Sequence, residues 1–219
     1  MEIPLSSRPL RKALCLAMRQ PKGILRNASA VVLVAALLGA RSSNAVEVEF
    51  VALSAADQWD TRTYRAIWGE FGERIVAAFE AVTCLPFSEP HIPAVVANDV
   101  SHSGGPTHPM QLRATYGRAV KQATLVHELG HRHLWQLAER LDGIDGHMTL
   151  YLVLDRVWAQ VWGEDFAVQR IQGESAWLAS YDYGQAWRWA RGLKRDERAE
   201  LWNQLLAMNG LPGGCTPTR

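Results

Sequence analysis

Residues 127–131 read His-Glu-Leu-Gly-His, and this pentapeptide constrains the middle of the chain more than any other feature. On an α-helix, residues four apart lie one above the other on one face, so His127 and His131 can hold the same ion. Glu128 points about 100° away from His127, near enough to reach a water on that ion. Because the motif works only on a helix, it predicts a helix through this part of the chain.

Two histidines and a glutamate in this spacing are typical of a catalytic zinc site. Such a site keeps three protein ligands and one water. Zinc lowers the pKa of the water and polarises a carbonyl, and the glutamate takes and returns the proton. We therefore expect one Zn²⁺ held by His127 and His131, with Glu128 as the general base. Gly130 costs about 1 kcal/mol of helix propensity relative to alanine, which is understandable if close packing or access for a ligand requires a bare backbone there.

Helical periodicity dominates most of the remaining chain, so we expect an α+β fold that is mostly helical. Apolar residues recur at steps of three and four over 60–82, and Pro86 ends that helix. Two β-like segments, 92–98 and 110–116, flank a loop rich in Gly, Ser, Pro and His. Further helices are expected at 118–141, 147–171, 183–193 and 196–208. The glycines within 142–146 mark a tight turn between the two long helices.

The third zinc ligand depends on how these two long helices pair. A tight turn between them predicts an antiparallel hairpin, which places the motif opposite roughly residues 157–161. Asp155 is the first choice, because a lone carboxylate in an apolar stretch is costly unless it meets a charge or a metal. Its structural alternative is an ion pair with Arg132 or Arg156. The other candidate ligands are Glu164, Asp165 and His147, the last of which falls nearer the turn.

The remaining histidines and two tyrosines admit both a structural and a functional interpretation. His91, His102 and His108 lie in or beside the loop, which is either exposed or covers a cleft. His133 projects roughly 140° from the metal face, which predicts a position at the surface or behind the ligands. Tyr181 and Tyr183 either pack in the core or donate a hydrogen bond to an oxyanion.

The N-terminal region has the pattern of an export signal. Residues 28–40 are uncharged but too few for a membrane-spanning helix, which needs about 20. Lys22 and Arg26 precede this run, and small residues at 43–45 follow it, as in a cleaved signal peptide. We expect a leader over 1–45 and one domain over 46–219, exported to the periplasm or the medium. The alternative is a cytoplasmic protein with a buried N-terminal helix. Cys84 and Cys215 either pair or stay free.

Composition narrows the range of partners. The formal net charge of +1 argues against a nucleic-acid binder, which usually shows a basic domain or stripe. We expect a peptide or protein substrate and no stable membrane span, while the sequence leaves the oligomeric state open. Seven of the nine tryptophans fall in or near the expected helices from 118 onward, where we expect them to fill a small, mostly helical core.

Over about residues 110–167 the chain resembles the zincin metallopeptidases, specifically their small gluzincin-like members. His127, Glu128 and His131 match the catalytic motif, and 110–116 resembles the edge strand that binds the substrate backbone. The block 147–167 and the later residues 183–189 are similar to a group of small, uncharacterised prokaryotic metallopeptidases. The resemblance implies a minimal zincin-like core and peptide-bond hydrolysis. Arg132 and His133 depart from the family pattern, in which uncharged and apolar residues follow the motif.

Two other functions are compatible with the same motif. A deformylase-like amidohydrolase also uses a helical motif of this kind, but it needs a cysteine ligand, for which Cys84 is the candidate. An exported binding or interaction protein with a structural zinc and no catalysis is the third possibility. A closed sphere of four protein ligands would favour that third possibility.

Overall fold

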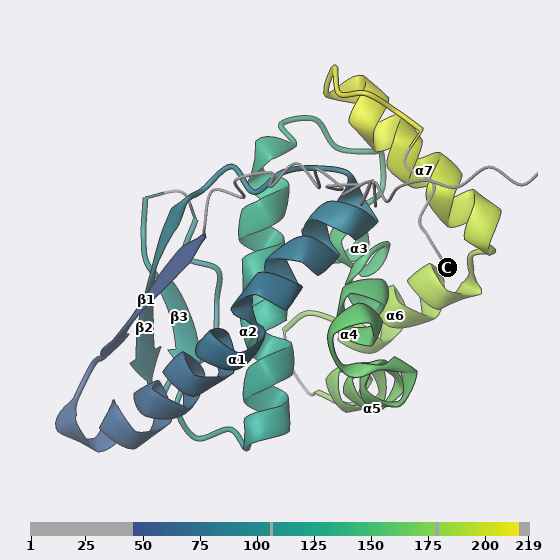
Figure 1. Cartoon of the computed structure of the whole chain (residues 1–219). Helices are drawn as coiled ribbons and strands as arrows, with labels where there is room; N and C mark the ends of the chain where they lie inside the picture. The colour runs from purple at the N-terminus through teal and green to yellow at the C-terminus, as the bar shows by residue number, and fades with distance from the viewer. Residues whose placement is uncertain (1–45, 106, 178–179, 215–219) are drawn as a thin grey trace, which may run out of the picture. The chain divides into compact units, whose positions relative to one another are not determined.

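The computed structural model describes residues 46–105, 107–177 and 180–214, which belong to one structural unit (Figure 1). The expected leader and Cys215 lie outside the described residues. The fold is α+β and mostly helical, with one small sheet, as expected. Among the described residues, no helix is both long and apolar enough to cross a membrane.

The sheet has three parallel strands in the order β1-β2-β3. They are β1 (Glu47–Ala52), β2 (His91–Ala97) and β3 (Met110–Arg113). β2 and β3 correspond to the two expected segments, although β3 ends three residues early. β1 is absent from the expectations, yet its alternation of exposed and buried residues is the pattern of a half-buried strand.

Two long helices lie between the sheet and the rest of the chain (Figure 1). The first, α1 (Gln58–Thr83), follows β1 and confirms the expected helix. It ends at Cys84, which adopts the left-handed conformation with φ 58°. The second, α2 (Arg118–His133), carries the motif and packs on α1 and β3. The motif at 127–131 therefore lies in the interior of the fold.

The two long helices expected at 118–141 and 147–171 are wrong in extent. α2 ends at His133 and continues only as a short 3-10 turn, Leu134–Gln136. The second is three helices, α3 (Gly146–Tyr151), α4 (Leu154–Trp162) and α5 (Glu164–Ser175). Residues 150–154 are all fully buried, and five consecutive side chains cannot share one helix face. Gly163, with φ 92°, separates α4 from α5.

The last two helices, α6 (Tyr183–Gly192) and α7 (Arg195–Met208), agree with the expected segments. Three tryptophans are fully buried in the core, namely Trp158, Trp187 and Trp202. The Trp202 indole N–H donates to the carbonyl of Thr83 at 3.0 Å, which ties α7 to the end of α1. Cys84 is disulfide-bonded, and its partner lies outside the described residues.

Candidate metal centre

Helix α2 holds the motif in a buried position. Residues 121–130 are all buried, and the side chains of His127 and Glu128 retain little exposure. Gly130 faces α1 and α3, where an added Cβ would lie 2.5 Å from Cδ1 of Leu150 and 3.3 Å from Cζ of Phe79. The expectation that close packing requires a glycine here is therefore confirmed.

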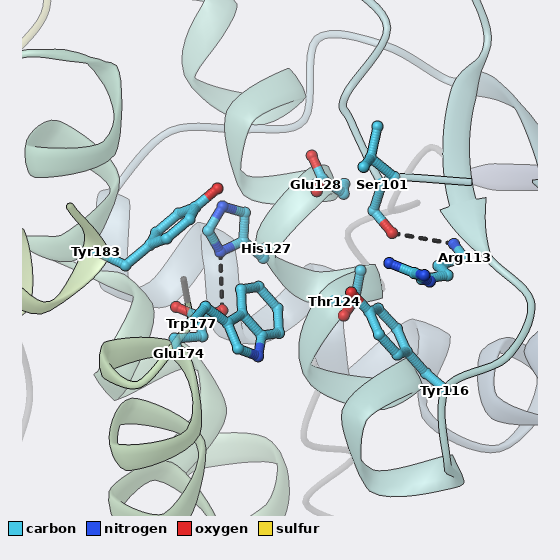
Figure 2. Close-up of a pocket in the computed structure, with 10 residues that line it drawn as sticks. Ser101, Arg113, Tyr116, Thr124, His127, Glu128, Glu174, Trp177 and Tyr183 are labelled. Carbon is cyan, nitrogen blue, oxygen red and sulfur yellow. Dashed lines mark hydrogen bonds and ion pairs between the residues drawn. The ribbon is translucent and has the colours of Figure 1, made fainter. Parts of the chain in front are cut away.

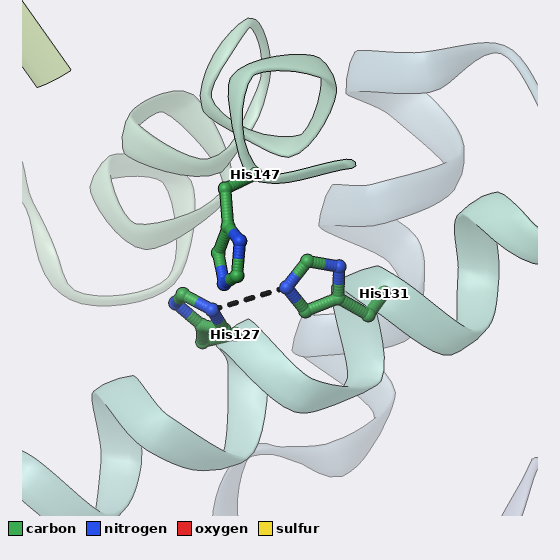
Figure 3. Close-up of side chains that lie close together, drawn as sticks. All are labelled: His127, His131 and His147. Carbon is green, nitrogen blue, oxygen red and sulfur yellow. Dashed lines mark hydrogen bonds between the residues drawn. The ribbon is translucent and has the colours of Figure 1, made fainter. Parts of the chain in front are cut away.

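Three histidines converge on one point (Figure 3). His127 and His131 come from successive turns of α2, and their Nε2 atoms are 3.2 Å apart. His147, in the first turn of α3, places its ring against both, with ring centroids 5.4 Å from His127 and 4.6 Å from His131. One nitrogen from each ring lies within 4.8 Å of the others.

This spacing suits a single metal ion. Zinc binds imidazole nitrogen at about 2.0–2.1 Å, so two tetrahedral ligands lie about 3.3 Å apart. The observed 3.2 Å between the two Nε2 atoms agrees with that value. A direct hydrogen bond would join only two of the rings, whereas a metal ion would accept a lone pair from all three histidines.

Glu174, on α5, determines how His127 is oriented. Its carboxylate is buried and accepts a hydrogen bond from His127 Nδ1 at 3.0 Å through Oε1. The Tyr151 hydroxyl and the Trp187 indole N–H both donate to Oε2, at 2.9 Å and 3.0 Å. Because a carboxylate can only accept, the Nδ1 proton stays on His127 and its Nε2 lone pair faces the other histidines.

The protonation of the three rings follows from their surroundings. Burial lowers the pKa of His131 well below its usual value, and the neighbouring His127 and His147 lower it further. Burial and His127 lower the pKa of His147 to about 4, against the opposing charges of Asp145 and Glu174. Both rings are thus neutral near pH 7 and can act as ligands. Burial lowers the pKa of His127, but the adjacent Glu174 outweighs it and raises the value.

Glu128 has the protonation behaviour of a general base that works near neutral pH. Burial raises the pKa of its carboxyl to about 7; His127 lowers the value and Glu174 raises it. A base is most effective when its pKa lies near the working pH. Glu128 also lines a cavity of about 400 Å³ together with His127, Thr124 and Tyr183 (Figure 2).

The structure does not bring Asp155 to the histidines. Asp155 forms an ion pair with Arg198 of α7, whose Nη1 lies 2.8 Å from Oδ2 and 3.1 Å from Oδ1. The expected alternative of an ion pair is therefore correct in kind, although the partner is neither Arg132 nor Arg156. The antiparallel hairpin that would bring Asp155 near the motif requires two long, straight helices over 118–141 and 147–171. Neither helix reaches that length in the structure.

Glu164 and Asp165 are exposed in the first turn of α5 and do not join the histidine group either. His147, expected near the turn, reaches the group because α2 ends eight residues earlier than expected. A sequence signal for this exists: Asp145 caps α3 by accepting a hydrogen bond from Met148 N–H. An aspartate three residues before a backbone donor marks a helix start, which puts His147 in a first turn.

His133 is buried, so its expected position at the surface is wrong. Its Nε2 lies 2.9 Å from the Thr83 hydroxyl, and its ring packs on Phe79 and Phe87. Burial lowers the pKa of His133 to about 3, which keeps the ring neutral. His133 therefore joins α2 to α1, on the side away from the three-histidine group that the structure describes.

The two tyrosines near the histidines differ in role. Tyr181 stacks on His147 with ring centroids 4.2 Å apart, and its hydroxyl donates to Asp145 at 2.9 Å. Tyr183 packs edge-on to His127 and His147 and lines the cavity beside Glu128. Tyr181 thus supports the ring of His147, whereas the position of Tyr183 suits a hydrogen bond to a bound ligand.

The outer edge of β3 is already occupied by the preceding loop. His102 and Gln111 exchange two backbone hydrogen bonds, with the His102 N–H donating at 3.0 Å and the Gln111 N–H at 2.8 Å. The Arg113 N–H donates to the Ser101 hydroxyl at 3.0 Å, and the Arg113 carbonyl accepts from the Tyr64 hydroxyl at 3.0 Å. A peptide cannot pair with this stretch of β3 unless the loop moves away.

The charged residue that directly follows the motif, Arg132, has a structural role. Its buried guanidinium pairs with Glu89 and donates to the carbonyls of Ser103, at 2.7 Å, and His108, at 3.2 Å. These bonds tie the loop before β3 to the helix that carries the motif. Val100 and Ser101 of that loop line the cavity, so the loop forms one of its walls.

No protein-family model matches the chain, and no curated protein or solved structure matches it significantly.

Proposed function

We propose that this protein is a zinc-dependent hydrolase of peptide bonds, with His127, His131 and His147 as zinc ligands and Glu128 as the general base. One observation carries the proposal: three imidazole nitrogens meet within 4.8 Å beside a buried glutamate that opens onto a cavity. The zincin resemblance suggests the peptide substrate, and the arrangement of histidines supports hydrolysis in general.

The ligand set favours a catalytic zinc over a structural one. Structural zinc sites are closed by four protein ligands, whereas catalytic sites have three and keep a position for water. Within the described part of the chain, the group contains three histidines and no fourth His, Cys, Asp or Glu. Cys84 is disulfide-bonded, which argues against the thiolate ligand that a deformylase-like enzyme needs.

The chemistry of the site divides between the metal and the chain. When bound, zinc would lower the pKa of a water and polarise the substrate carbonyl. Glu128 accepts the proton from the attacking water and passes it to the leaving amine. Glu174 keeps the Nε2 lone pair of His127 available, and the hydroxyl of Tyr183 lies where it can donate to the oxyanion.

The test is zinc analysis combined with a proteolysis screen on wild type and Glu128→Gln. We expect one zinc in both proteins, and a loss of peptidase activity in the variant of about 100-fold or more. Glu200→Gln, at an exposed position of α7, is the matched control and should retain full activity. Equal activity in Glu128→Gln would refute the general base, and freshly purified protein without bound metal would refute the metal site.

We further propose that the chain is exported and loses residues 1–45. This proposal rests on the signal-like sequence of the N-terminal region. N-terminal sequencing of the secreted form should then begin near Val46. A soluble cytoplasmic protein with an intact N-terminus would reject it.

A further inference from the structure

Among the described residues that line the cavity beside Glu128 is an arginine, Arg113, at the end of β3 (Figure 2). Its guanidinium Nε donates to the Thr115 hydroxyl at 3.3 Å, and its Cζ lies 5.5 Å from the ring centre of Tyr116. No carboxylate of the described residues forms an ion pair with it.

Three other interior cations do have a carboxylate partner. Lys121 pairs with Asp60, Arg132 with Glu89 and Arg198 with Asp155. Arg113 is half-buried, and among the described residues only its Nε has a hydrogen-bond acceptor. A partly desolvated guanidinium with most of its donors free is costly, so the arrangement favours an anionic ligand.

A second, independent observation comes from α2. Thr124 is 3% exposed and lines the same cavity, one helical turn before Glu128. Its hydroxyl is buried and has no hydrogen-bond partner in the described structure. A buried hydroxyl without a partner is uncommon, because its desolvation costs about 1–3 kcal/mol. Figure 2 shows Thr124 and Arg113 on the same side of the cavity, across from His127 and Tyr183.

We propose that Arg113 and Thr124 form a subsite for a carboxylate group of the substrate, next to the metal centre. This inference rests on the proposed hydrolase function and names its substrate class: peptides that carry a carboxylate close to the scissile bond. The guanidinium fork and the hydroxyl both donate hydrogen bonds, and a carboxylate offers two oxygens to accept them.

The surroundings of the subsite favour recognition by side chains. The backbone groups of β3 that would otherwise bind a peptide are occupied by His102, Ser101 and Tyr64. The stacked rings of Tyr116 and Trp177, 6.1 Å apart, form an apolar wall of the cavity. One cation and one hydroxyl suit a singly charged carboxylate, because Glu128 in the same cavity would repel a doubly charged phosphate.

The carboxylate can come from an acidic side chain or from the C-terminus of the peptide, and four probes separate these sources. Acetyl-tetra-alanine is compared with its C-terminal amide. Acetyl-Ala-Ala-Glu-Ala amide is compared with the same peptide carrying Gln in place of Glu. Binding is measured by calorimetry on zinc-loaded Glu128→Gln, so that peptide cleavage does not complicate the result. The background variant leaves Arg113 and Thr124 unchanged.

We expect at least one carboxylate probe to bind about 10-fold more tightly than its neutral partner. This ratio of affinities is the size of effect that one charge-assisted hydrogen bond produces. Adding Arg113→Gln should abolish the difference, Arg113→Lys should restore part of it, and Thr124→Val should reduce it. Arg118→Gln is the matched control, because Arg118 is exposed and paired with Glu70. Its discrimination between the probes should equal that of the background protein.

Equal affinity for the charged and neutral probes, no binding of any probe, or undiminished discrimination in Arg113→Gln would each overturn the subsite. The hydrolase proposal fails by a different result, namely lack of zinc or lack of cleavage by the protein with Glu128 intact. A protein that binds the carboxylate probes through Arg113 but cleaves no peptide would keep the subsite and refute the hydrolase.

Discussion

Replacing Glu174 by glutamine changes a single atom in the support of His127, and the structure allows its effect on zinc affinity to be worked out. Oε2 of Glu174 accepts from both Tyr151 and Trp187, while Oε1 accepts from His127 Nδ1. In Glu174→Gln the amide oxygen would stay with the two donors, and its NH₂ would face His127. His127 Nδ1 must then accept, which moves the proton to Nε2 and blocks metal binding.

Zinc can still bind to the Glu174→Gln variant if the introduced amide rotates, but the rotation leaves the Trp187 N–H without an acceptor. The Tyr151 hydroxyl can turn and accept, whereas an indole N–H can only donate. A buried donor without a partner costs about 1–3 kcal/mol. At about 1.4 kcal/mol for each tenfold change, zinc affinity should fall by about 5- to 150-fold.

Competition with a chromogenic zinc chelator measures this affinity directly, and Glu164→Gln, exposed on the same helix, is the control. The tautomer argument also predicts that Trp187→Phe partly restores zinc affinity in the Glu174→Gln background, because no indole N–H is then left unpaired. A zinc Kd within about twofold of wild type for Glu174→Gln, well outside the expected range, would refute the reasoning. Failure of Trp187→Phe to restore affinity would refute the assigned cost.

Four further predictions concern the ligand set, the packing of the motif helix and the bound metal. His147→Ala should weaken zinc binding by more than the about 100-fold that loss of a supporting residue costs. Asp155→Asn should leave zinc binding unchanged and lower the free energy of unfolding by about 1.5–3 kcal/mol, because the charged hydrogen bond to Arg198 is lost. Loss of zinc in Asp155→Asn would contradict the choice of His147 over Asp155 as the third ligand. Gly130→Ala should destabilise the protein by about 1–2 kcal/mol, because overpacking against Leu150 exceeds the gain in helix propensity. Gly173→Ala, in open space on α5, should instead be neutral or stabilising; thermal melts of both variants measure the difference. Removal of zinc by a chelator should lower the stability by about 2.7 kcal/mol if zinc was present at 100 times its Kd; an unchanged melting temperature would count against the metal site.

Local patterns in the sequence predict much of the fold. The periodicity of α1, the segments β2 and β3, and the last two helices are all recognisable without coordinates. The breaks within 134–163 are not, because they arise from packing. A run of apolar residues such as 150–154 has no polar face to show the helical period, and only the surrounding core shows where it must bend.

The sequence likewise predicts one part of the candidate site and misses the other. His127, Glu128 and His131 come from one short motif on one helix, so their arrangement follows from helix geometry alone. His147 and Glu174 come from α3 and α5, and their distance from the motif depends on where the intervening helices end. A lone carboxylate in an apolar stretch points to Asp155 and not to Glu174, because polar residues surround Glu174 in the sequence and its burial comes from packing alone.

The two edges of the small sheet are protected from aggregation in different ways. An open strand edge is a template for pairing with another chain. At β3 the chain supplies its own cover, through the backbone pairing of His102 with Gln111. At β1 the protection is electrostatic, because Glu47 and Glu49 are exposed along the edge strand. The loop that lines the cavity thus also guards the domain against strand-to-strand association, so loosening it by mutation would expose the protein to self-assembly as well as change its cavity.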